Sequence, residues 1–161
     1  MLGAKQFYNI MMEYLAETIV VYVLEARYVN VKSFGGVGGT MKPYCTVNLR
    51  YISGKRTKAH KTRAQARSSN PQFMEVFTFG ATEDLRDAVG IEVELKDAIG
   101  NEKIGSVWVP LDDVERSPTR AINDWFRVCT GKSTTEAVVS TGSVPEVRLH
   151  VEYETGGEPY A

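Results

Sequence analysis

The feature that most restricts the fold of this chain is the alternation of apolar and polar residues in short segments separated by turn residues. In residues 44–51, for example, Cys45, Val47 and Leu49 fall on one side of an extended chain. A period of two predicts half-buried β-strands. On this basis, and on β-branched apolar content, eight strands are expected: 18–26, 44–51, 55–67, 75–80, 88–95, 105–111, 123–129 and 146–153.

Helical segments that could connect parallel strands are missing from the pattern, and only residues 81–87 predict a short helical turn. The predicted fold is therefore all-β, an eight-stranded antiparallel β-sandwich. With 161 residues the chain is most simply one domain, placed by the strands at residues 18–154. The polar stretch 130–143 predicts a loop, and residues 155–161 predict a flexible tail.

The N-terminal extension, residues 1–17, fits two patterns. One helical stripe is formed by Phe7, Ile10, Met11, Tyr14 and Leu15, and a period of two is formed by Tyr8, Ile10, Met12 and Tyr14. The helix is favoured. It would pack on its own domain or allow self-association of the chain through residues 1–17.

Composition places the chain among cytoplasmic proteins. No apolar run approaches the ~18 residues that cross a bilayer, and the run IVVYVL (19–24) follows acidic residues and lacks the basic start of a secretion signal. The only cysteines, Cys45 and Cys129, stand far apart, so buried free thiols in a reducing compartment are expected rather than a disulfide framework. Within the cytoplasm, a peripheral membrane or cytoskeletal location is compatible with this composition.

Charge is distributed unevenly along the chain, although the net charge is only −1. No Asp or Glu lies between Glu25 and Glu75, whereas ten of the 19 lysines and arginines do. Such an asymmetry favours an anionic partner more strongly than the net charge does. A merely solvated basic face is the alternative.

Residues 35–44 (GGVGGTMKPY) raise the question of a phosphate-binding loop. The pattern GxxxxGK[ST] does not fit, and the third glycine of GxGxxG would fall at Met41. A dinucleotide site also requires a following helix, whereas Pro43 and the alternation after it predict a strand. The glycines are therefore expected to form a sharp loop at the tip of the sandwich.

Several segments resemble the C2 domain family. The run SNPQFMEVFTF (69–79) is similar to the family signature Asn-Pro-x-aromatic-x-Glu-x-Phe-x-Phe. Further pieces stand in the family's order: LEAR (24–27), PYCTVNL (43–49), IG (104–105), PL (110–111), WF (125–126) and EVRLHVEYE (146–154). The resemblance covers most of residues 18–154. It implies a β-sandwich that binds membranes or proteins.

This family occurs in two circularly permuted forms, in which one strand either begins or ends the domain. Residues 146–154 fit that strand better than residues 6–14 do. The resemblance therefore implies the second permutation, as in phospholipases C. It also leaves residues 1–17 free to form a helical extension.

Calcium-dependent members of the family bind the ion with aspartates from two apical loops, and Ca²⁺ requires about six to eight oxygen ligands. In the first loop the aspartate positions correspond to Gly36 and Lys42, and in the second loop the first position is Leu95. Asp97 and Glu102 are the carboxylates that remain. The resemblance thus implies a degenerate site without calcium, in which Lys42 replaces the metal charge and pairs with Asp97 or lies in solvent.

Membrane-binding members use a lysine-rich strand for phosphoinositide headgroups, and residues 61–63 (KTR) are similar to its Lys-x-Lys motif. On a strand, the period of two places Lys55, Lys61, Arg63 and Arg67 on one face and Arg56, Lys58 and His60 on the other. On the neighbouring strand the family's lysines correspond to Thr46 and Asn48. Half of the usual lipid site is therefore missing, and Arg50 is expected to compensate in part.

Other functions fit the sequence less well. An enzyme is not expected, because His60 and His150 have no nucleophile or carboxylate at a recognisable spacing, and a zinc site lacks ligand spacing. No cofactor is implied. Nucleic acid is disfavoured because aromatic residues do not interleave with the cations. The open alternative is a C2 domain that binds protein in a trafficking, scaffold, centriolar or ciliary protein.

Overall fold

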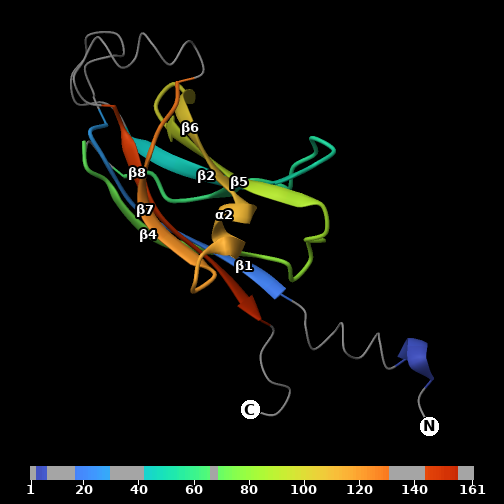
Figure 1. Ribbon diagram of the computed structural model, residues 1–161. Coiled ribbons are helices and arrows are strands. Elements are labelled where there is room, and N and C mark those ends of the chain that lie inside the picture. Colours follow the sequence, from blue (N-terminus) through green and yellow to red (C-terminus); the bar gives the residue numbers. More distant parts are fainter. Residues whose placement is uncertain (1–2, 7–16, 30–41, 66–68, 131–143, 156–161) are drawn as a thin grey trace.

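Two four-stranded antiparallel sheets pack face to face in the computed structural model (Figure 1). The structure describes residues 3–6, 17–29, 42–65, 69–130 and 144–155. The first sheet has the order β4-β1-β8-β7, formed by Gln72–Phe79, Glu17–Arg27, Glu146–Thr155 and Ala121–Arg127. The second has the order β3-β2-β5-β6, formed by His60–Lys61, Pro43–Tyr51, Ala88–Asp97 and Glu102–Pro110. The predicted eight-stranded antiparallel sandwich is confirmed.

The core lies between the sheets and is built from every second residue of the strands. Members of it that are fully buried include Ile19, Val21, Val23, Val47, Leu49, Ile91, Leu95, Leu149 and Val151. Phe79 is also fully buried, and the ring of Phe77 at the edge of the core stacks on His60 with centroids 5.5 Å apart. The alternation in the sequence therefore reports the inner face of these strands correctly. Of the two thiols expected to be buried, Cys45 is buried, whereas Cys129 lies beyond the end of β7 and is exposed.

The basic segment 55–67 differs from the prediction, because only two of its residues form a strand, β3. Two threonine hydroxyls interrupt the ladder along β2. Thr57 Oγ1 accepts a hydrogen bond from the Leu49 N–H at 3.0 Å, and Thr62 Oγ1 accepts one from the Cys45 N–H at 2.9 Å. Since these hydroxyls replace main-chain carbonyls as acceptors, the segment follows the edge of β2 without continuous strand pairing.

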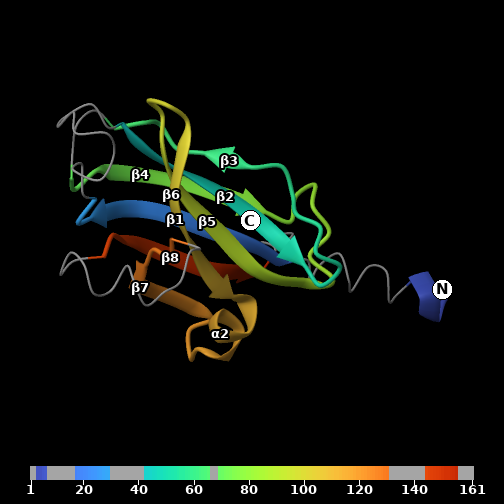
Figure 2. The same cartoon turned by 90° about the horizontal axis from the view of Figure 1, so that it is seen from above.

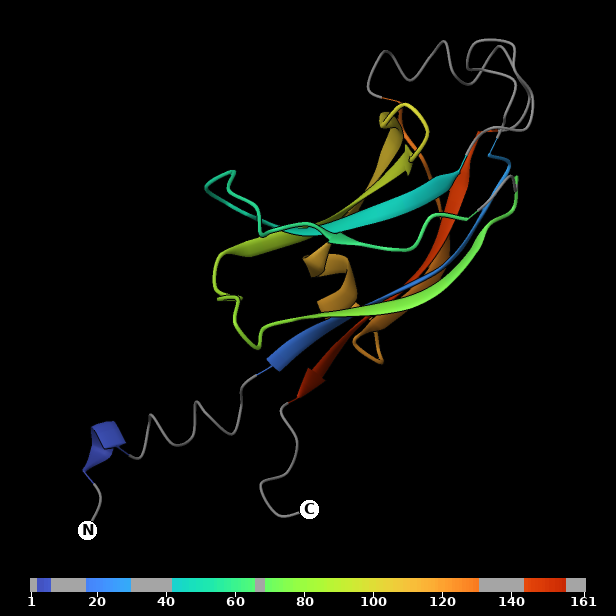
Figure 3. The same ribbon diagram turned by 180° about the vertical axis from the view of Figure 1, so that it is seen from behind.

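The predicted helical turn at residues 81–87 is wrong, and a helix occurs instead where the strand 105–111 was expected to end. This helix, α2 (Leu111–Arg116), buries Leu111 and Val114, which lie three residues apart and share one helical face. Figure 3 shows α2 between the two sheets, where it connects β6 and β7, an edge strand of each sheet. The i,i+3 apolar pair with acidic residues in the first turn was a helix signal in the sequence.

The ends of the domain lie together, because Glu17 at the start of β1 pairs with Thr155 at the end of β8. Figure 2 shows β8 between β1 and β7. Residues 4–6 form a helical turn, and the remaining predicted elements in 7–16, 131–143 and 156–161 lie outside the described residues. Among the helices described, none has the length and apolar character to span a membrane.

Candidate functional site

Four cations gather on the outer face of the second sheet. β5 turns Glu92, Glu94 and Lys96 outward, because Ile91, Val93 and Leu95 alternate with them in the core. Residues that are paired across neighbouring strands turn their side chains to the same face. Lys61 of β3 pairs with Thr46 of β2, which pairs with Glu94, and Arg50 of β2 pairs with Gly90 of β5, so Lys61 and Arg50 share the outer face with Glu92 and Glu94. Arg56 reaches the same face, where its Nη1 lies 3.7 Å from Glu94 Oε1. We call Arg50, Arg56, Lys61 and Lys96 the basic surface.

The structure brings together only part of the predicted lipid-binding set. Arg50 and Lys61 belong to the basic surface, whereas Lys55 lies in the turn after β2, where its carbonyl accepts the Tyr51 N–H. Arg63 lies at the open edge of the sandwich, and its N–H donates to Glu75 Oε2 of the opposite sheet at 2.6 Å. Arg67 lies outside the described residues.

Arg56 and Lys96 were missed as site residues for different reasons. The sequence placed Arg56 on the opposite face, because a continuous strand was assumed from 55 to 67. An isolated bridge between Arg56 and Arg50 instead aligns the two arginines side by side. Lys96 follows Glu92 and Glu94 at a spacing of two, so the alternation within 88–95, extended by one residue, would have found it.

Thr46 and Asn48, which correspond to the family's lysines on the neighbouring strand, are not accessible to a ligand. They are 2% and 4% exposed, because the segment after β2 covers them, and Asn48 Nδ2 donates to the Thr57 carbonyl at 2.8 Å. A ligand on this face therefore meets the longer charged side chains around them. The cations of the basic surface are the accessible groups, with Arg50 and Arg56 exposing 35% and 56% of their side chains.

The apical carboxylate Asp97 has a structural role. Its Oδ1 accepts the N–H of Lys42 at 2.9 Å and the N–H of Ile99 at 3.0 Å, and the residue is 8% exposed. The expected link between Lys42 and Asp97 therefore exists, but through the main-chain amide of Lys42 rather than through an ammonium ion pair. This carboxylate joins the start of β2 to the β5–β6 turn.

The other predicted apical residues do not converge around Asp97. Leu95 is fully buried in the core, and Glu102 is exposed at the start of β6, while Gly36 lies outside the described residues. Across the described ranges, no group of three or more His, Cys, Asp and Glu side chains could hold a metal ion.

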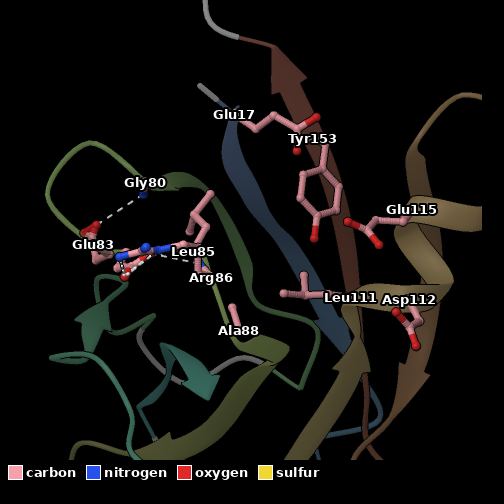
Figure 4. Close-up of a pocket in the computed structure, with 11 residues that line it drawn as sticks. Glu17, Gly80, Glu83, Leu85, Arg86, Ala88, Leu111, Asp112, Glu115 and Tyr153 are labelled. Atoms are coloured by element: carbon pink, nitrogen blue, oxygen red, sulfur yellow. Dashed lines mark hydrogen bonds and ion pairs between the residues drawn. The ribbon is translucent and has the colours of Figure 1, made fainter. Parts of the chain in front are cut away.

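A pocket lies at the end of the sandwich where β1 begins and β8 ends. This basal pocket encloses about 420 Å³ and is drawn in Figure 4. Its lining residues are Glu17, Gly80, Glu83, Asp84, Leu85, Arg86, Ala88, Leu111, Asp112, Glu115 and Tyr153. Asp84 pairs with Arg86 and Glu17 pairs with Arg120, so two of the five carboxylates form ion pairs.

The basal pocket is unsuited to an anionic ligand. Burial, followed by the carboxylates of Glu115 and Glu17, raises the pKa of the Tyr153 phenol above its usual value. A raised phenol pKa reports an environment that disfavours added negative charge. The basal pocket is therefore opposite in charge to the basic surface.

Comparison with known proteins gives a consistent family. A family model described as "C2 domain" matches residues 17–128. Ras GTPase-activating protein 3 of Bos taurus is 28% identical over 84% of this chain and 18% of its own length. Synaptotagmin-2 of Homo sapiens is 32% identical over 68% of this chain and 28% of its own length. The chain thus spans less than a third of these curated relatives.

Solved structures share the fold. A C2 domain of a plant extended synaptotagmin 1 superposes with a TM-score of 0.62 at 21% identity, covering 89% of this chain and 98% of that chain. A structure of extended synaptotagmin 2 that contains its SMP domain and two C2 domains gives 0.64 at 18% identity, covering 92% of this chain and 30% of that chain. At these identities the likeness concerns the fold alone.

Proposed function

The chain belongs to the C2 domain family, and from this premise we propose that it is a calcium-independent, non-enzymatic module that docks on anionic membranes containing phosphoinositide. The observation that carries the proposal is the basic surface, which places Arg50, Arg56, Lys61 and Lys96 on one face of one sheet. Phosphomonoester groups carry up to two negative charges and three acceptor oxygens, which lysine and arginine bind well.

The chemistry of the described apical residues supports the proposed independence from calcium. One carboxylate oxygen of Asp97 accepts hydrogen bonds from two main-chain amides. Leu95, which stands where calcium-binding members of the family have an aspartate, is buried in the core. Ca²⁺ needs about six to eight oxygen ligands, and the part of this end that the structure describes offers no group of three carboxylate, His or Cys side chains that could hold it. The place of β8 between β1 and β7 supports, in the same way, the proposed second permutation of the family.

The strength of such a surface can be bounded. Each basic residue near an anionic leaflet contributes about 1 kcal/mol, so four give about 4 kcal/mol, which corresponds to a millimolar Kd. Stable attachment therefore needs charge-assisted hydrogen bonds to a specific headgroup, or several linked copies of the domain. The longer curated relatives are compatible with additional domains that would supply such multivalency.

Cosedimentation with vesicles tests the proposal. Arg56→Glu combined with Lys61→Glu is expected to reduce binding to vesicles with phosphatidylinositol bisphosphate at least about tenfold, because four units of charge change on the docking face. Arg116→Glu combined with Arg127→Glu changes the total charge equally on α2 and β7 and should leave binding nearly unchanged. Equal effects of the two pairs, or wild-type binding that needs calcium, would contradict the proposal.

A protein partner is the second candidate, and exposed apolar residues favour it. Met74 and Val76 point outward from the edge strand β4 with 67% and 53% exposure, and Trp108 is 47% exposed on β6. A Met74→Ser and Val76→Ser variant that retains vesicle binding but loses a protein ligand would assign these residues to that role. Retention of both activities would remove this candidate.

A further inference from the structure

Two carboxylates lie in the middle of the basic surface. Glu92 and Glu94 project from β5, which is an inner strand of the second sheet. Cations lie beside them on β2, in the segment that follows β2, and on β5 itself. The two glutamate side chains are only 16% and 11% exposed. The basic surface therefore surrounds two nearly buried negative charges.

These carboxylates and three cations form one continuous chain of ion pairs. Arg50 Nη2 lies 3.5 Å from Glu92 Oε2, and Arg56 Nη1 lies 3.8 Å from Glu92 Oε1. Arg56 Nη1 also lies 3.7 Å from Glu94 Oε1, and Lys96 Nζ lies 3.5 Å from Glu94 Oε2. Each carboxylate thus serves two cations, which leaves one net positive charge on this network.

The pairs are looser than hydrogen-bonded ion pairs. Charge-assisted hydrogen bonds usually measure about 2.7–2.9 Å, whereas all four contacts lie at 3.5–3.8 Å. Arg56 is also more than half exposed. The cations can therefore turn toward an incoming anion, provided that this anion competes with the carboxylates.

We propose that Glu92 and Glu94 set a charge threshold on the basic surface, so that only a ligand with densely clustered negative charge binds. This inference rests on the proposed membrane-docking function and deepens it. A headgroup with two phosphomonoesters can draw Arg50, Arg56 and Lys96 away from the two carboxylates. A headgroup with one net charge, such as phosphatidylserine, cannot offset the loss of the internal pairs and the repulsion from the carboxylates.

The opposite role for the two glutamates predicts an opposite sign. If Glu92 and Glu94 served to position the arginines for the ligand, their neutralisation would weaken binding to every anionic vesicle. If they oppose the ligand, neutralisation strengthens binding, and most for the weakly charged lipid. Lys61 forms no ion pair among the described residues, so its contribution should stay constant in either case.

The experiment compares Glu92→Gln combined with Glu94→Gln against a matched pair, Glu25→Gln combined with Glu146→Gln. The matched pair also removes two ion-paired carboxylates, but from the outer face of the first sheet. There Glu25 pairs with Arg148, and Glu146 pairs with Arg27. Binding is measured with phosphatidylcholine vesicles that contain either phosphatidylserine or phosphatidylinositol bisphosphate at equal total surface charge.

The expected result is a gain of about tenfold to thirtyfold on phosphatidylserine vesicles for the Glu92 and Glu94 pair, from about fivefold per neutralised charge. The gain on bisphosphate vesicles should be smaller, and the matched pair should change neither. Unchanged or weaker binding by the Glu92 and Glu94 pair overturns the inference, whatever the wild type does. Failure of the wild type to bind bisphosphate vesicles instead overturns the proposed function.

A folding check keeps the comparison valid. Thermal unfolding of both pairs is recorded alongside binding, since Glu94 is nearly buried. If the double variant unfolds, Glu92→Gln alone carries the test, with Glu146→Gln alone as its control. A single neutralised carboxylate should still give about a fivefold gain on phosphatidylserine vesicles, and no gain overturns the inference.

Discussion

Asp97 illustrates how one carboxylate takes its role from its surroundings. In a calcium-binding loop it would need other carboxylates beside it, but here the N–H groups of Lys42 and Ile99 both donate to its Oδ1. The Ala98 N–H also donates to the Lys42 carbonyl at 2.9 Å. The residue therefore closes the turn between β5 and β6 onto the start of β2 and satisfies two amides that would otherwise be unpaired.

Asp97→Ala is expected to destabilise the protein by about 1–3 kcal/mol, because two partly buried amides lose their acceptor. Urea unfolding measures the change. Glu102→Ala is the control, since Glu102 is exposed and should fall within about 0.5 kcal/mol of the wild type. Equal stability of the two variants would mean that solvent satisfies both amides.

Gly90 provides a second test at the residue scale. A Cβ built at Gly90 would lie 2.2 Å from Cη2 of the Trp108 indole, so the half-exposed ring lies directly against the backbone of β5. Gly90→Ala is expected to displace the indole and to cost about 1–3 kcal/mol. Trp108→Ala in the same chain should remove that penalty in a double-mutant cycle. A penalty that persists without the indole would place the strain in the backbone instead.

At the scale of elements, β1 and β8 are joined by a polar cluster on the outer face of the first sheet. His150 Nε2 lies 2.9 Å from Glu152 Oε2, and the ring of Tyr22 meets His150 edge-on at 5.2 Å. The hydrogen bond from His150 is the main cause that holds the pKa of Glu152 below its usual value. Because the pKa is lowered in the folded state, this carboxylate stabilises the fold above its unfolded pKa and loses that effect in acid.

Glu152→Gln should therefore be less stable than the wild type near neutral pH, and the difference should vanish as the pH falls through the lowered folded-state pKa of Glu152. Urea unfolding at a series of pH values measures both curves. His150→Gln should reduce the pH dependence in the same window, because it removes the main cause of the shift. A difference that is constant from neutral to acidic pH would rule out this linkage.

The sequence predicted elements well where alternation alone determines them. β1, β2, β5 and β8 were found because each turns a row of apolar residues into the core, and the strand expected at 75–80 overlaps β4. Segment 55–67 could not be predicted correctly, because its course depends on Thr57 and Thr62 hydroxyls that accept β2 amides. The site was predicted incompletely for the same reason. Arg56 was assigned to the wrong face, and the position of Glu92 and Glu94 among the cations becomes evident only when β5 is placed beside β2.

At the scale of the whole molecule, the two ends of the charge distribution are separated. The basic surface covers the second sheet, whereas the basal pocket carries Asp112 and Glu115, neither of which forms an ion pair among the residues described. A net charge of −1 therefore conceals a basic face and an acidic end. Which of them an approaching membrane senses depends on the screening length of the solution.

This separation predicts an unusual dependence on salt. The screening length is about 30 Å at 0.01 M ionic strength and about 8 Å at 0.15 M. The basal carboxylates therefore repel an anionic membrane at low ionic strength, and this repulsion is screened at physiological ionic strength. Asp112→Asn combined with Glu115→Gln should strengthen vesicle binding at low ionic strength and leave it unchanged at physiological ionic strength. Cosedimentation at the two salt concentrations measures the effect. A gain of equal size at both concentrations would contradict the prediction, because it would mean that the basal pocket itself contacts the membrane.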